Sequence, residues 1–251
     1  MRLLHFRVSH FNEKVRWTLD FKKLPHVREA MRPGLHARRM KKLTGQPLVP
    51  VLIIDGTPIA GSARIIDELE RRHPDPPLYP ADPADRARAL AIQQYFDDEV
   101  APEVRRLFWS TYVPDSAATA RVLSDGFGAG TRFLFRTAVP VLRAVFRKNI
   151  GLDPANIARA RERLPAHFDH LEKQIGPSGY LVGDRFSIAD LAAAAILTAI
   201  LRPPQFSYPI PEPWSPGLVE LRDSLAQRAG FRWVMDMYAR HRGTSSEVAP
   251  P

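Results

Sequence analysis

The chain of 251 residues contains no cysteine. This absence excludes disulfide bonds, zinc sites built on cysteine and a cysteine nucleophile, and it fits a reducing compartment. A membrane-spanning run is also missing, because the least polar stretch, Ile188 to Leu201, contains Asp190 and is shorter than the roughly 20 apolar residues that cross a bilayer. Met1 to Val8 shows no secretory signal. We therefore expect a cytoplasmic protein without stable membrane insertion.

Positive charge is in excess and unevenly placed. The formal net charge is +9, and residues 1–80 hold 15 Lys and Arg against 8 Asp and Glu, whereas residues 81–251 hold 21 against 19. The densest basic patch lies between Arg28 and Lys42. It is either a solvated face or a positive mouth for a substrate with two carboxylates. No base-reading motif accompanies it, so we expect no nucleic-acid partner.

The first third of the chain predicts alternating strands and helices. Asp55-Gly56 is a strong hairpin signal between two short apolar runs, and Asn12 and Ser62 are candidate N-caps of the helices that follow them. In order, the pattern predicts a strand over 2–8, a helix from 12, a strand over 26–31, a helix from 33, strands over 51–54 and 57–60, and a helix from 62. This is the element order of a thioredoxin-like α/β domain.

A proline-rich segment, His73 to Pro83, separates this pattern from one that is entirely helical. We expect residues 1–76 to form the α/β domain, 77–84 a linker, 85–243 an all-helical domain and 244–251 a disordered tail. Within the helical part, Ser187 and Asp190 form a predicted capping box, in which each side chain bonds the other residue's backbone N–H.

Two stretches carry a family resemblance. The run Val49-Pro50 to Ser62 and the run Tyr180 to Leu191 resemble the corresponding parts of glutathione transferases, in the same order around the linker. The resemblance implies a thioredoxin-like domain followed by an all-α domain, a homodimer, glutathione as co-substrate, a small apolar electrophile as second substrate, and no metal or organic cofactor. It implies an enzyme that conjugates or transfers the thiol of glutathione.

The resemblance also assigns the thiol site. Ser9 is the candidate hydroxyl that stabilises the thiolate, with Asn12 as an alternative donor, and Lys14-Val15-Arg16 matches the helix of the serine-type classes. Val49, before Pro50, would pair its backbone with the peptide of glutathione, and a cis proline would expose it. Ser62 would bind the γ-glutamyl carboxylate at a helix N-terminus. Arg38, Arg39 or Lys41 would bind the glycyl carboxylate.

Two positions depart from the family pattern. Gly61 stands where a Glu or Gln usually contacts the ligand, and His10 stands where many relatives have proline. These departures favour one alternative, a non-catalytic binding or interaction protein of the same fold. The basic patch around Arg38 leaves a second alternative, a transferase that uses another low-molecular-weight thiol.

Other clusters have competing interpretations. Three aromatic residues are either core or the apolar wall for the electrophile: Phe108, Trp109 and Tyr112. The acidic run Asp97 to Glu103 is a solvated face or a cation site. His167 and His170 share a helix face, but without a third ligand we expect no metal. The arginine-studded segment 132–148 could rest on an anionic membrane, or pack in the core with its arginines reaching outward.

Overall fold

The computed structural model describes residues 1–250, apart from the side chains of Pro140 and Leu142. A mixed four-stranded sheet occupies the first part of the chain, with strand order β2-β1-β3-β4. Its strands are β1 (Arg2–His5), β2 (Val27–Ala30), β3 (Val51–Ile54) and β4 (Thr57–Ala60). β1 and β2 are parallel and are connected by helix α1 (His10–Phe21), since parallel neighbours need a crossover. β3 runs antiparallel to β1 and β4.

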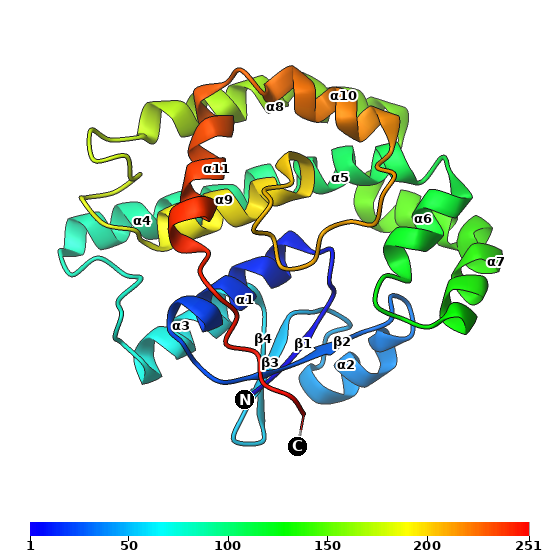
Figure 1. Cartoon of the computed structure of the whole chain (residues 1–251), viewed down its shortest axis with the longest axis horizontal. Helices are drawn as coiled ribbons and strands as arrows, with labels where there is room; N and C mark the ends of the chain where they lie inside the picture. The colour runs from blue at the N-terminus through cyan, green and yellow to red at the C-terminus, as the bar shows by residue number, and fades with distance from the viewer. Residues whose placement is uncertain (251) are drawn as a thin grey trace.

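Helices cover both faces of this sheet (Figure 1). α1 and α3 (Ser62–Arg72) pack on one face, where Val15 and Leu69 join a buried apolar cluster with the strands. α2 (His36–Thr44) covers the other face through the buried Met40. The predicted hairpin is confirmed, because Asp55 and Gly56 have φ values of 49° and 81°, the positive pair that a two-residue type I′ turn needs.

The second part is all helical, which confirms the predicted fold class. At its centre lies α9 (Ile188–Leu201), in which every residue is buried and which packs against α1 of the sheet domain. The other elements are α4 (Pro83–Tyr95), a π-helical turn η1 (Phe96–Val100), α5 (Ala101–Tyr112), α6 (Ser116–Leu123), α7 (Ala129–Phe146), a π-helical turn η2 (Arg147–Gly151), α8 (Pro154–Gln174), α10 (Pro216–Leu225) and α11 (Ala229–His241). Within residues 1–250, no helix combines the length and apolar character needed to cross a membrane.

The predicted capping box opens α9. Ser187 Oγ accepts from the N–H of Ala189 at 3.3 Å, and Asp190 accepts from the N–H of Ser187 at 2.9 Å. Asp190 also accepts from the N–H of Leu181 at 2.8 Å, so the box fixes the extended segment that precedes it. Burial raises the pKa of Asp190 to about 6, although the donated hydrogen bonds oppose this shift.

Three helix starts differ from the sequence prediction. The helix expected from residue 33 begins at His36, with Leu35 as its N-cap. α1 begins at His10 with Ser9 as its N-cap, so Asn12 lies inside the first turn and is not the cap. α3 begins at Ser62 itself, and Gly61 is the N-cap with a φ of 90°. Only glycine adopts that backbone conformation readily, which lets the chain turn directly from β4 into the helix.

The C-terminal segment also differs from the expectation of a disordered tail. Figure 1 shows it running from α11 past α1 to the edge of the sheet. Glu247 forms a parallel bridge with His26, beside edge strand β2, and the N–H of Val248 donates to the carbonyl of His26 at 2.9 Å. The N–H of Ser246 donates to Asp20 at 2.8 Å. Composition hid this order, because the segment is held by non-local polar contacts; Pro251 lies outside the described residues.

Candidate functional site

A cavity of about 580 Å³ lies where the sheet domain meets the helical domain. The sheet domain lines it with the β1–α1 connection, the start of α2 and the loop before β3. The helical domain lines it with α5 and with the end of α7. The site is therefore built from segments far apart in the sequence, and its walls are mostly apolar.

Ser9 lines this cavity at the N-terminus of α1. It is half-buried, and its side chain makes no capping hydrogen bond. Its backbone carbonyl accepts from the N–H of Glu13 at 3.0 Å, so the residue is fixed while the hydroxyl stays available. A hydroxyl beside the N-terminus of a 12-residue helix can stabilise an anion in the cavity.

Val49 lines the same cavity, and the Val49–Pro50 peptide bond is cis. Pro50 is buried, and its carbonyl accepts from the N–H of Gly61 at 3.1 Å. This bond ties the loop before β3 to the start of α3. Ser62 is buried in the first turn of that helix, next to Gly61, but neither residue lines the main cavity.

Of five further predicted residues, two line the cavity and three do not. Phe108 and Trp109 line the cavity from α5, whereas Tyr112, one turn further, is fully buried in the helical core. Asn12 is also fully buried and does not line the cavity. Arg38 is exposed on α2 and likewise does not line it. The structure thus brings Ser9, Val49, Phe108 and Trp109 together.

Comparison with known proteins identifies the family of this chain. Residues 3–77 match the profile of the glutathione S-transferase N-terminal domain, and residues 154–223 match that of the C-terminal domain. The chain belongs to the glutathione S-transferase family. FtsZ-localized protein A of Caulobacter vibrioides is 27% identical over 205 residues, 79% of this chain and 76% of that protein. A probable glutathione S-transferase of Nicotiana tabacum is 25% identical over 196 residues, covering 77% and 68%. A glutathione S-transferase structure from Rhodospirillum rubrum shares the fold, with a TM-score of 0.61 at 23% identity over 100% of this chain and 96% of that one.

Four polar residues of this transferase-like cavity were not among the predicted site residues, and one of them is Asn149 in η2. His10 follows Ser9, His36 lies at the start of α2, and Arg105 lies on α5. The helical spacing of Arg105 with Phe108 and Trp109 places the three on one face of α5, and this signal could have found the arginine. His10 could have been found from its place beside Ser9.

Burial governs the charge of the two histidines. His10 is almost completely buried, and burial, followed by the charges of Arg105 and Lys14, lowers its pKa to about 3. Burial also lowers the pKa of His36, whose Nε2 lies 3.1 Å from the carbonyl oxygen of Pro47. Both rings are therefore neutral near pH 7 and serve as hydrogen-bonding groups.

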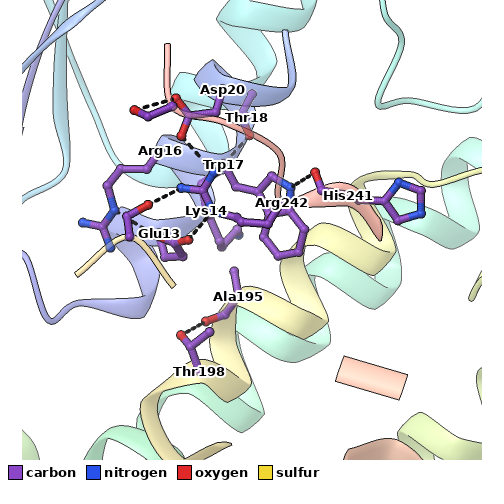
Figure 2. A network of polar contacts seen from close by, with 12 residues as sticks. Glu13, Lys14, Arg16, Trp17, Thr18, Asp20, Ala195, Thr198, His241 and Arg242 are labelled. Carbon is purple, nitrogen blue, oxygen red and sulfur yellow. Dashed lines mark hydrogen bonds and ion pairs between the residues drawn. The ribbon is translucent and has the colours of Figure 1, made fainter. Parts of the chain in front are cut away.

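Arg16 holds the loop that carries Ser9. Its buried guanidinium donates to the carbonyls of Phe6 at 3.0 Å, Arg7 at 3.2 Å and Ser9 at 3.3 Å. Glu13 accepts from Arg16 at 2.7 Å, and the same carboxylate accepts from Arg242 at 2.7 Å (Figure 2). The arginine in the Lys14-Val15-Arg16 motif is thus a positioning residue for the β1–α1 connection.

Arg242, directly after α11, connects the end of that helix to two carboxylates of α1. It donates to Glu13 and, at 2.8 Å, to Asp20. Burial alone would raise the pKa of Glu13, but the Arg242 and Arg16 guanidinium groups hold it below its usual value. The same balance of burial against Arg242 and Arg28 lowers the pKa of Asp20. The two carboxylates are therefore ionised partners of buried arginines.

The acidic run and the paired histidines have structural partners. Asp97 accepts from Lys14 Nζ at 2.6 Å, which links η1 to α1. Glu103 accepts from Arg163 at 2.9 Å and lies 2.7 Å from Nε2 of His167. Among residues 1–250, no group of three or more His, Asp or Glu is placed to hold a metal ion.

Proposed function

We propose that this protein binds glutathione against Val49 and Ser9 and transfers its thiol to a small apolar electrophile. The observation that carries the proposal is the composition of one cavity. Ser9, whose hydroxyl makes no capping hydrogen bond at the N-terminus of α1, lines it from the sheet domain. Phe108 and Trp109 line it from the helical domain. A thiol and an apolar co-substrate can therefore occupy one cavity.

The chemistry requires a thiolate, since the thiol itself is a weak nucleophile. Ser9 would donate its O–H to the sulfur, and the N-terminus of α1 would favour the negative charge, so the thiol proton is released near neutral pH. The thiolate then forms a sulfur–carbon bond with the electrophile; with a chloronitrobenzene, the carbon–chlorine bond breaks and chloride leaves with its electron pair. His10 is neutral near pH 7, so it adds no charge to the positive potential of the helix N-terminus and of Arg105.

The peptide part of glutathione would extend from Val49 toward the start of α3. Ser62 there offers a backbone N–H and a hydroxyl to the γ-glutamyl carboxylate. Gly61 supplies no side chain at this point. Since Arg38 is exposed and Arg39 is paired with Glu29, His36 is a better placed neighbour for the peptide than either. We also propose a cytoplasmic homodimer that needs no cofactor beyond glutathione as co-substrate.

Substitution of Ser9 tests the catalytic proposal. Ser9→Ala removes the donor to the thiolate, and a hydrogen bond to a charged group is worth about 1.5–3 kcal/mol. We expect kcat/KM with a chloronitrobenzene to fall about tenfold to a hundredfold and its pH profile to move to higher pH. Ser224→Ala, on the exposed side of α10, is the matched control. Unchanged turnover in Ser9→Ala would remove that serine from the mechanism.

A second candidate function follows from one relative. FtsZ-localized protein A matches most of this chain, and its name describes localisation with FtsZ. The alternative is therefore a non-catalytic protein that associates with FtsZ, and the lack of a side chain at Gly61 favours it. Pelleting this protein with polymerised FtsZ tests the alternative: co-sedimentation together with no glutathione turnover would replace the transferase proposal. Use of another small thiol would instead appear as turnover with that thiol alone.

A further inference from the structure

The helical wall of the cavity contains an arginine without an acidic partner. Arg105 lies on α5 and lines the cavity together with Phe108 and Trp109. Its Nε is buried and has no hydrogen-bond partner within the described residues. Of the residues described around the cavity, Arg105 alone carries a full charge, and no aspartate or glutamate is among them. Arg105 is half-buried, and a guanidinium that is partly removed from water without a counter-ion is stabilised when a ligand supplies the negative charge.

His10 adds a second unpartnered group at the same place. It is 4% exposed, it lines the cavity, and its Nε2 has no hydrogen-bond partner within the described part of the chain. The charge of Arg105 is felt at this ring, which lies at the N-terminus of α1. The two side chains come from different domains, so they meet only in the folded protein.

The charged groups near Arg105 have other partners. Its neighbour Arg106 is bonded elsewhere, because Arg106 Nε donates to the carbonyl of Gly151 at 3.1 Å. Asp97, the nearest member of the acidic run to α1, is bonded to Lys14 through both carboxylate oxygens at 2.6 Å. Asp97 is thus committed to another cation.

We infer that the cavity selects an aromatic organic anion as its second ligand, with a carboxylate or similar oxyanion held by Arg105 and His10 and the ring against Phe108 and Trp109. This inference rests on the proposed function for the identity of the site as a transferase cavity. It narrows the electrophile from any small apolar molecule to one with an acidic group. Because Arg105 lies on α5 beside the aromatic wall, the anion belongs to the electrophile and not to the peptide of glutathione.

Calorimetric titration without glutathione tests this selectivity. The probes are p-nitrobenzoate and its methyl ester, which share the ring and differ in charge. We expect the wild-type protein to bind the acid at least tenfold more tightly than the ester. Arg105→Gln should weaken the acid about tenfold and leave the ester unchanged, while Arg105→Lys should recover part of the loss. Arg132→Gln, on the exposed surface of α7, is the matched control.

The outcomes separate this inference from the proposed function. Equal affinity for acid and ester, or an acid affinity that Arg105→Gln leaves unchanged, overturns the inference. A loss of glutathione affinity in Arg105→Gln also overturns it, because the arginine would then belong to the thiol peptide. An acid preference that depends on Arg105 supports it even if glutathione fails to bind, in which case only the transferase proposal is lost. Quenching of tryptophan fluorescence by the acid should disappear in Trp109→Phe, which places the bound ring in this cavity.

Discussion

At the scale of single residues, burial and hydrogen-bond partners decide what each polar group of the site can do. His10 and Ser9 are neighbours, yet Ser9 keeps a free hydroxyl at the cavity while His10 is packed out of water. Arg16 is equally buried, but three carbonyls satisfy its guanidinium. Their roles therefore follow from their partners: Ser9 donates, Arg16 positions, and His10 stays uncharged.

The titration of His10 is a direct consequence. Its folded pKa of about 3 lies below the ordinary value of 6.5, so the unfolded chain takes up a proton that the folded chain refuses. Stability from this group is complete above pH 6.5 and is lost as the pH falls toward 3. We expect the His10 ring to remain neutral by NMR at pH 5. We also expect wild type to lose about 2 kcal/mol more stability than His10→Gln between pH 7 and 5.

A His10 signal that titrates near pH 6.5 would contradict this account. It would mean that the ring is hydrated in solution, and the anion subsite would then lose one of its two groups.

At the scale of elements, α1 is the helix on which the site depends. Its N-terminus presents Ser9 and His10, and its last turns carry Asp20, which anchors α11 and the C-terminal segment. Trp17, between them, is fully buried and donates to the carbonyl of His241 at 3.0 Å (Figure 2). The end of the chain therefore fixes the helix that begins at the cavity.

Removing Arg242 should release this anchor. Arg242→Gln leaves Glu13 and Asp20 each short of a buried cation, and breaking such a pair costs about 3 kcal/mol. Both carboxylates have lowered pKa values, so their contribution is present above their ordinary values and is lost as the pH falls below about 4.5. Urea unfolding should show the full difference from wild type at pH 7 and a smaller one at pH 4 and below. Arg240→Gln, on the same helix and more exposed, should change stability little.

A constant difference between wild type and Arg242→Gln across this pH range would show that Arg242 stabilises by packing on Trp17 and not through the carboxylates.

Local signals predicted the elements well and the site only in part. The Asp55-Gly56 turn and the box of Ser187 and Asp190 depend on residues within three positions of each other, so the sequence carried them. The start of α3 was misplaced because a cap serine and a first-turn serine share the same preference for helix N-termini. Contacts such as Glu247 with His26, or Arg105 beside His10, join segments that only the tertiary fold brings together.

At the scale of the whole molecule, the cavity exists because the two domains pack against each other. α9 is buried along its whole length and packs on α1, and the ion pair of Lys14 with Asp97 crosses the same interface. Each domain supplies one wall, so neither would bind both substrates alone. The family profiles match residues 3–77 and 154–223, so the α5 wall of the cavity lies outside both matches.

Thermal unfolding with and without reduced glutathione tests the central claim most directly. Ligand at about 100 times its dissociation constant should stabilise the folded protein by roughly 2.7 kcal/mol, which is a rise in Tm of several degrees for a chain of this length. We predict that rise for the wild-type protein and a smaller one for Ser62→Ala, which removes a hydroxyl from the carboxylate site. An unchanged Tm at millimolar glutathione would contradict the proposed thiol site and leave the binding-protein alternative in its place.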